Sequence, residues 1–324
     1  MKQITLRLAV LSALGLISAQ ATATGLEPIP ATGFSGTAYR LCNTTGNFGS
    51  SITTAPTTLS NNDCAVFPAN DSASPVTGFT LAANASRPVV MNNTYTNFTN
   101  VTVGTVTDRV WRNAAATECI FGTKFVPANI DYRPTVAGDP DTVGNQYFEV
   151  NDIARGGFSS SGTVQAGYFV SGGSSSIYRI GRTYTAVQHR ALQYDTATNK
   201  AIPGTNYVAL PPAPGSAAAI NGEDFAITAT TPATTVAANQ NADVNSEWVD
   251  FTFDAVWADD DGSTNPASPM TYIQAPCSAG TIPVATNAIR LRQTAQEYAR
   301  FIQVSVDGFA PTNATPSPAP VVPF

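Results

Sequence analysis

Apolar and polar residues alternate most regularly between Trp248 and Trp257, in the segment WVDFTFDAVW. A period of two is that of a β-strand with one buried face. We therefore expect a core strand here that ends at the polar turn 259–262. The apolar residues that share one face are Val249, Phe251, Phe253, Ala255 and Trp257, and the polar residues that share the other are Asp250, Thr252 and Asp254.

Shorter segments show weaker forms of this alternation, and Gly, Pro and Asn residues separate them. No segment carries the apolar spacing of a convincing amphipathic helix. Many short strands with turn residues between them are typical of an all-β fold. We expect an antiparallel β-sandwich, or two β-rich lobes, with long Gly/Pro/Thr-rich loops. The expected strands are 37–42, 97–112, 118–126, 147–150, 164–170, 177–192, 270–274, 288–293 and 301–306.

The domain organisation follows from length and proline content. A chain of 324 residues can form one large β-domain or two smaller ones. Segment 203–219 is the best candidate for a linker or crossover, because proline cannot join a central strand ladder. It separates an N-terminal β-rich domain at 24–202 from a C-terminal one at 220–310, which form either two units or one sandwich. The Pro-rich tail 311–324 is expected to be disordered.

The N-terminal segment 1–23 has the pattern of a secretory signal peptide. Lys2 and Arg7 are followed by an apolar run of ten residues at 8–17 and by small residues at 19–23. That run is too short for a membrane helix, which needs about 20 apolar residues. We expect a mature N-terminus between residues 22 and 26, no membrane span in the mature chain, and a secreted, periplasmic or cell-surface location.

The charge content narrows the range of partners. Only 12% of residues are charged and the formal net charge is −6. Nucleic-acid binding draws most of its affinity from a basic surface, so nucleic acid is an unsuitable partner. The partners that remain are a second copy of the chain, a surface glycan or another protein.

Four cysteines follow the predicted signal peptide: Cys42, Cys64, Cys119 and Cys277. An even number of cysteines in an exported chain indicates disulfides. Three pairings are available, and we favour Cys42–Cys64 and Cys119–Cys277. No CxxC motif for a metal or redox site is present.

No stretch carries the signature of an enzyme. His189 is the only histidine, which rules out multi-histidine zinc sites and leaves one residue for any serine–histidine triad. Paired carboxylates could serve a glycosidase, but the sequence does not measure their separation. We therefore expect no enzymatic activity. The carboxylates of suitable type are Glu118, Glu149, Asp152, Asp250 and Asp254.

Two segments are candidates for ligand binding. Asp259, Asp261 and Asn265 supply oxygen atoms of the kind that bind Ca²⁺. The EF-hand spacing fails, because its twelfth position falls on Met270, and Asp-Gly after a strand is also common turn chemistry. We expect no cofactor, with Ca²⁺ as the alternative. Trp248 points to the face opposite Trp257 and is a candidate stacking platform for a sugar ring.

These observations favour an exported, disulfide-bonded β-sandwich with a structural or adhesive role at the cell surface, in a matrix or in a filament. The alternative is a carbohydrate-binding or glycan-active secreted protein. A third hypothesis is a periplasmic accessory protein that binds a small ligand.

Overall fold

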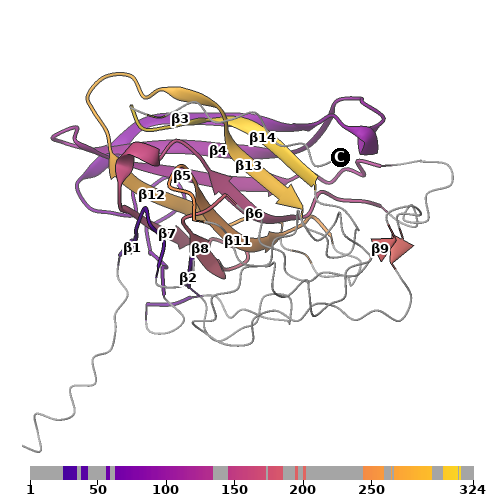
Figure 1. The fold of residues 1–324 in the computed structure, drawn as a ribbon, viewed down its shortest axis with the longest axis horizontal. Helices are drawn as coiled ribbons and strands as arrows, with labels where there is room; N and C mark the ends of the chain where they lie inside the picture. The colour runs from indigo at the N-terminus through magenta and orange to yellow at the C-terminus, as the bar shows by residue number, and fades with distance from the viewer. Residues whose placement is uncertain are drawn as a thin grey trace, which may run out of the picture.

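The described part of the chain consists of strands, turns and loops (Figure 1). The only helical elements in it are the 3-10 turns η1 (Thr94–Thr96) and η2 (Ser159–Ser161). No helix in these ranges is long and apolar enough to cross a membrane. The computed structural model describes residues 25–34, 38–42, 56–58, 63–133, 145–172, 174–184, 194–195, 200–201, 244–258, 264, 266–293, 302–312 and 314.

The strands form two six-stranded antiparallel sheets and a two-stranded pair of β9 (Tyr194–Asp195) with β10 (Lys200–Ala201). The first sheet has the order β1 (Glu27–Ile29), β7 (Val164–Phe169), β12 (Met270–Pro276), β5 (Glu118–Pro127), β4 (Val101–Asn113), β3 (Phe79–Met91). The second has the order β14 (Ile302–Phe309), β13 (Val284–Gln293), β6 (Val150–Arg155), β11 (Val249–Ala255), β8 (Arg179–Gly181), β2 (Tyr39–Leu41).

Each sheet combines early and late parts of the chain. In the first sheet β12 lies between β5 and β7. In the second sheet β11 lies between β6 and β8. The interior of both sheets therefore depends on strand pairs that are distant in sequence.

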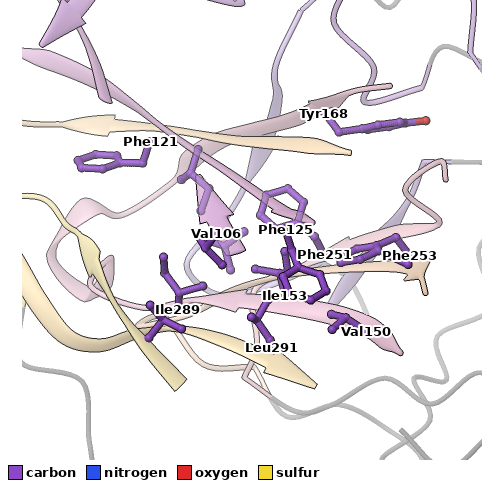
Figure 2. Close-up of a cluster of buried hydrophobic side chains, with 14 of the residues drawn as sticks. Val106, Phe121, Phe125, Val150, Ile153, Tyr168, Phe251, Phe253, Ile289 and Leu291 are labelled. Carbon is purple, nitrogen blue, oxygen red and sulfur yellow. The ribbon is translucent and has the colours of Figure 1, made fainter. Parts of the chain in front are cut away.

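One hydrophobic core lies between the two sheets (Figure 2). From the second sheet, Phe251, Ile153 and Leu291 point into it from adjacent strands. From the first sheet, Phe121 and Phe125 of β5 belong to the same cluster. A shared core between two sheets is the defining feature of a β-sandwich.

A second, smaller cluster lies on the opposite face of the first sheet. Trp111 of β4 and Tyr272 of β12 pack with their rings tilted and their centroids 5.8 Å apart. Gly122 makes room for this arrangement, because a Cβ atom there would lie 2.5 Å from the Trp111 ring. The loop before β3 covers the cluster with Val66 and Val76, and Trp111 Nε1 donates a hydrogen bond to the carbonyl oxygen of Ser72.

A disulfide ties the sheets together along one edge. Cys42 directly follows β2 of the second sheet, whereas Cys64 is hydrogen-bonded to Tyr168 in β7 of the first. Their Cα atoms lie 5.2 Å apart. An ion pair of 3.0 Å between Arg40 of β2 and Glu27 of β1 crosses the same edge.

An ion pair joins the sheets near the other edge, where β14 packs beside β3 and β4 (Figure 1). Asp108 of β4 and Arg155 of β6 are both fully buried, and their side chains lie 3.5 Å apart. Arg87 of β3 adds a contact with the ring of Phe309, at 5.1 Å from its centroid. A disulfide thus joins the sheets at one edge of the sandwich, and a fully buried ion pair joins them near the other.

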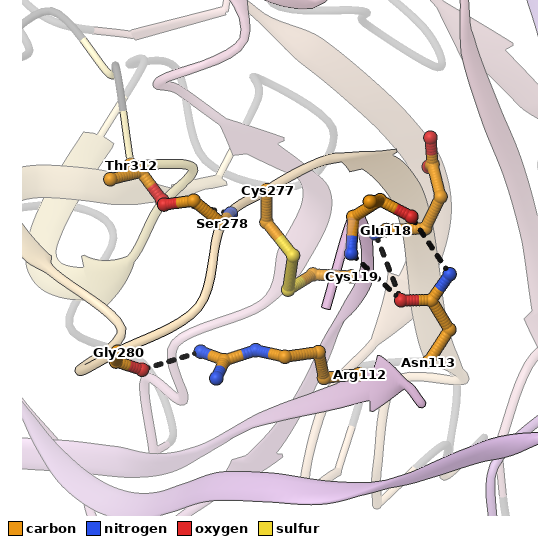
Figure 3. The surroundings of a disulfide bond; sticks show 9 residues. Arg112, Asn113, Glu118, Cys119, Cys277, Ser278, Gly280 and Thr312 are labelled. Atoms are coloured by element: carbon orange, nitrogen blue, oxygen red, sulfur yellow. Dashed lines mark hydrogen bonds between the residues drawn. A yellow bond between two sulfur atoms is a disulfide. The ribbon is translucent and has the colours of Figure 1, made fainter. Parts of the chain in front are cut away.

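The second disulfide, Cys119–Cys277, joins the start of β5 to the residue that follows β12 in the first sheet (Figure 3). The Cα atoms are 5.6 Å apart, and the bridge closes a separation of 158 residues. Hydrogen bonds surround it, including one from Arg112 Nη2 to the carbonyl oxygen of Gly280. Both disulfides join the same cysteines that the sequence analysis paired.

The predicted all-β sandwich class is confirmed, and most of its strands lie near the predicted segments. Several elements differ from the prediction, and β8 covers only three residues of the predicted strand 177–192. Strand β6 begins where the predicted strand 147–150 ends, and β3, with 13 residues, was not predicted. Trp257 lies beyond the end of β11 and is 38% exposed, because the strand and its inward alternation end at Ala255.

The predicted signal peptide 1–23 and linker 203–219 lie outside the described residues, as does most of the tail 311–324.

Candidate functional site

Five polar side chains occupy the face of the second sheet that points away from the core. Side chains alternate along a strand, so the neighbours of core residues point the opposite way. All five are buried, which distinguishes them from an ordinary solvated strand face. We call this set the polar face: Asp152 of β6, Asp250 and Thr252 of β11, and Arg290 and Arg292 of β13.

Arg292 contacts two carboxyl groups with one nitrogen atom. Its Nη1 lies 3.2 Å from Asp152 Oδ1 and 3.3 Å from Asp250 Oδ2. The strand register produces this arrangement, because Asp152 pairs with Thr252 on one side and with Arg292 on the other. Asp152 and Asp250 therefore share one arginine from two adjacent strands.

Aromatic rings hold the arginines of the polar face. The Arg290 guanidinium lies 4.2 Å from the Trp248 ring centroid and 5.9 Å from that of Tyr184. The Arg292 guanidinium lies 6.0 Å from the Tyr184 ring centroid. Such cation–π contacts are worth about 2 kcal/mol or more when they are desolvated. Gly156 leaves space for the Trp248 ring, since a Cβ atom there would approach it to 2.8 Å.

The polar face includes buried atoms with no hydrogen-bond partner among the described residues, such as Asp250 Oδ1, Thr252 Oγ1 and Arg292 Nη2. They include an acceptor, a hydroxyl group and a donor. An unsatisfied buried polar atom costs about 1–3 kcal/mol, so the burial of this face opposes stability.

The electrostatic field of the polar face favours neutral acids. Burial is the largest cause that raises the pKa of Asp250 well above its usual range, and the carboxyl group of Asp152 adds to the effect. Arg292 and a hydrogen bond from Tyr39 act in the opposite direction. Burial also raises the pKa of Tyr39 well above its usual range, and both carboxylates contribute.

The structure brings together two of the five carboxylates that the sequence put forward for a glycosidase. Asp152 and Asp250 lie on adjacent strands and share Arg292. Glu149 instead accepts a hydrogen bond from Asn151, and Glu118 lies on β5 in the other sheet. Residue type alone identified Asp152 and Asp250, but only the pairing of β6 with β11 places them side by side.

Trp248, the predicted stacking residue, is buried against Arg290 and does not form an exposed platform in this conformation. The predicted Ca²⁺ ligands Asp259, Asp261 and Asn265 lie outside the described residues, as does His189. In the ranges that are described, no group of three or more His, Cys, Asp or Glu side chains could hold a metal ion.

A second polar cluster lies on the outer face of the first sheet. Lys124 Nζ donates to Asp71 Oδ2 at 2.7 Å and to Ser171 Oγ at 2.6 Å. Ser171 Oγ also donates to Asp71 Oδ2 at 3.1 Å. This cluster therefore fastens the loop that carries Asp71 to the sheet.

The chemistry available on the polar face is proton binding by a carboxyl pair and anion or hydroxyl recognition by arginine and aromatic side chains. Sequence reasoning missed Arg292, because nothing in its surroundings marks it apart from other strand arginines. Comparison with protein-family models, with curated proteins and with solved structures finds no match to this chain.

Proposed function

We propose that this chain is an exported structural or adhesive protein that packs against other molecules through a neutral face of its first sheet. The location rests on the signal-peptide pattern at 1–23 and on two disulfides, which persist in oxidising compartments. The role is non-enzymatic and is performed at the cell surface, in a matrix or in a filament.

The observation that carries this proposal is an uncharged, exposed surface on β3, β4 and β5. Register places its side chains on the face opposite the core. Protein interfaces are depleted in charged residues at their centre, so a neutral face is suited to contact. The exposed residues of this neutral face are Asn84, Ser86, Pro88, Val90, Thr102, Thr105 and Val126.

The two cations farther along the same face do not disturb it. Lys124 is paired with Asp71, and Arg109 donates to the carbonyl oxygen of the same residue. The net charge of −6 is therefore carried elsewhere on the molecule. This local neutrality supports contact with a second copy or with another neutral surface.

The edge of β3 is unsuited to assembly by strand addition. Pro88 has no N–H to donate, and register shifts interrupt the strand after Leu81 and after Val89. Natural sheets use these devices to prevent edge-to-edge pairing. Contact through the neutral face, rather than through its edge, is the mode that we propose.

The test places charges on the neutral face. Ser86→Lys and Thr105→Lys together should weaken self-association or adhesion about tenfold or more, because like charges would meet across the interface. Sedimentation velocity and adhesion to host material measure the effect, and thermal unfolding should be unchanged. Ala115→Lys, in the exposed hairpin loop, is the matched control. A chain that stays monomeric and non-adherent at all concentrations would refute the proposal.

The export of the protein is tested separately. N-terminal sequencing of the exported protein should begin between residues 22 and 26. Material that begins at Met1 and remains inside the cell would contradict export without bearing on the neutral face.

A carbohydrate-binding or glycan-active role is the second candidate, and the carboxyl pair Asp152–Asp250 beside Arg292 favours it. Paired carboxyl groups are the acid and base of glycosidases. Both groups are fully buried, so a glycan would reach them only after the polar face is uncovered. A glycan array probed with the wild type and with Asp152→Asn tests it, since binding or hydrolysis must be lost in the variant.

A further inference from the structure

The carboxyl groups of Asp152 and Asp250 converge on one arginine nitrogen inside the protein. They come from β6 and β11 and are fully buried. Both lie within 3.3 Å of the same Arg292 nitrogen. Two ionised carboxylates beside one guanidinium would bury an excess of negative charge, which a proton on one of them removes.

We propose that Asp152 and Asp250 share one proton at neutral pH and that this proton helps to keep the polar face packed, so the fold is weakened as pH rises. The inference goes beyond the proposed function, because it holds whether or not the chain is adhesive. It is a property of the second sheet, whereas the neutral face belongs to the first.

The charged and titratable groups around the pair come from every described strand of this region. Arg290 and Arg292 of β13 are accompanied by Arg179 of β8, Tyr39 of β2 and Tyr184. Burial raises the pKa of Tyr39 further above its usual range, so this tyrosine does not lose its proton before the carboxyl pair does. The pair is thus the group whose protonation changes first.

The interactions around the carboxyl pair favour its protonated form. Arg292 stabilises the ionised form and lowers the pKa of Asp250, but burial and the adjacent Asp152 carboxyl group raise that pKa by more. Burial penalises any additional charge, and two carboxylates in contact repel each other. Like-charged carboxyl groups at one site are a general cause of a strongly raised pKa.

The sign of the pH effect follows from linkage. In the unfolded chain an aspartate loses its proton near pH 3.9, at about its reference value. In the folded chain Asp250 keeps the proton to higher pH, so the folded state binds one more proton in this interval. The stabilisation that Asp250 contributes is complete below its pKa in the unfolded chain. It is lost as the pH rises toward its pKa in the folded chain.

The experiment compares urea unfolding of the full chain between about pH 5 and about pH 8 with that of Asp250→Asn. One proton released on unfolding should raise the unfolding equilibrium constant about tenfold per pH unit, and Asn, which cannot ionise, should remove this contribution. Asp108, another buried carboxyl group, contributes equally to both proteins and cancels in the difference. Glu118→Gln on β5 is the control and should behave as the wild type. Identical slopes for the wild type and Asp250→Asn would overturn the proposal.

A second measurement does not depend on the variant's stability. In carbon-13 NMR of carboxyl-labelled aspartate, the wild type should show at neutral pH the signal of an aspartate that shares a proton. This signal should change or disappear in Asp152→Asn and in Asp250→Asn. A protonated signal that survives both variants belongs to another residue and overturns the assignment. The shared proton is also refuted if every aspartate titrates near its usual value of about 3.9.

Discussion

Asp108 of β4 and Arg155 of β6 form an ion pair through the interior of the sandwich and both bind the main chain of Phe309. Arg155 Nη2 donates to the Phe309 carbonyl oxygen at 2.7 Å, and the Phe309 N–H donates to Asp108 Oδ2 at 2.7 Å. Gly308 permits the approach, because a Cβ atom there would lie 2.5 Å from Arg155 Nη1. Two charges on different sheets thereby position the end of the last strand.

Removal of one partner of this ion pair should strongly destabilise the protein. Asp108→Ala leaves the buried Arg155 guanidinium without its counter-ion, which costs about 3–5 kcal/mol of unfolding free energy. Urea denaturation measures the change. Asp108→Leu combined with Arg155→Met should recover much of the loss, since apolar side chains of similar volume can replace a buried pair. A loss below about 1 kcal/mol for Asp108→Ala would place the pair at a solvated surface.

The two faces of β11 should respond differently to mutation. Phe251→Ala removes a buried aromatic side chain from the core and should cost about 3–5 kcal/mol. Thr252→Val should be neutral or stabilising, because the Thr252 hydroxyl group is buried without a hydrogen-bond partner. Equilibrium unfolding of both variants checks this. A large loss for Thr252→Val would mean that its hydroxyl group has a partner.

The disulfides should contribute unequally. Replacing Cys42 and Cys64 by Ser opens a loop of sequence separation 22 and should cost about 3 kcal/mol in the chain-entropy model. The same change at Cys119 and Cys277 opens a separation of 158 and should cost about 5 kcal/mol. Thermal unfolding of the two double variants ranks them. Thiol titration of the unreduced, unfolded wild type should find no free cysteine.

Quenching of tryptophan fluorescence distinguishes the three tryptophans. Trp111 and Trp248 are buried, whereas Trp257 is 38% exposed. Acrylamide should therefore quench one component readily, and Trp257→Phe should remove that component. Trp111→Phe is the matched control and should leave the quenchable component in place. Retention of quenching in Trp257→Phe would show that Trp257 is packed in the core, as the strand alternation had predicted.

Strand β3 is an element that the pattern of apolar and polar residues does not predict. Its inward residues include Ala83, Ala85 and Arg87, so its two faces differ little in hydropathy. An edge strand with one neighbour needs little apolar surface, and its pairing with β4 supplies the stabilisation instead. The alternation of β11 is clear because Phe251 and Phe253 must fill the core between two sheets.

Local chemistry determined the class of fold, the strand β11 and the presence of disulfides, because a period of two and an even number of cysteines are properties of the chain itself. The choice among the three possible pairings was made by the tertiary structure. The tertiary structure alone decided which polar residues meet. Asp250 and Thr252 read from the sequence as a solvent-facing row, yet they are buried beside Asp152 and Arg292. The physical reason is that register between β6, β11 and β13 is a long-range property. A shift by one residue would send each of these side chains to the other face.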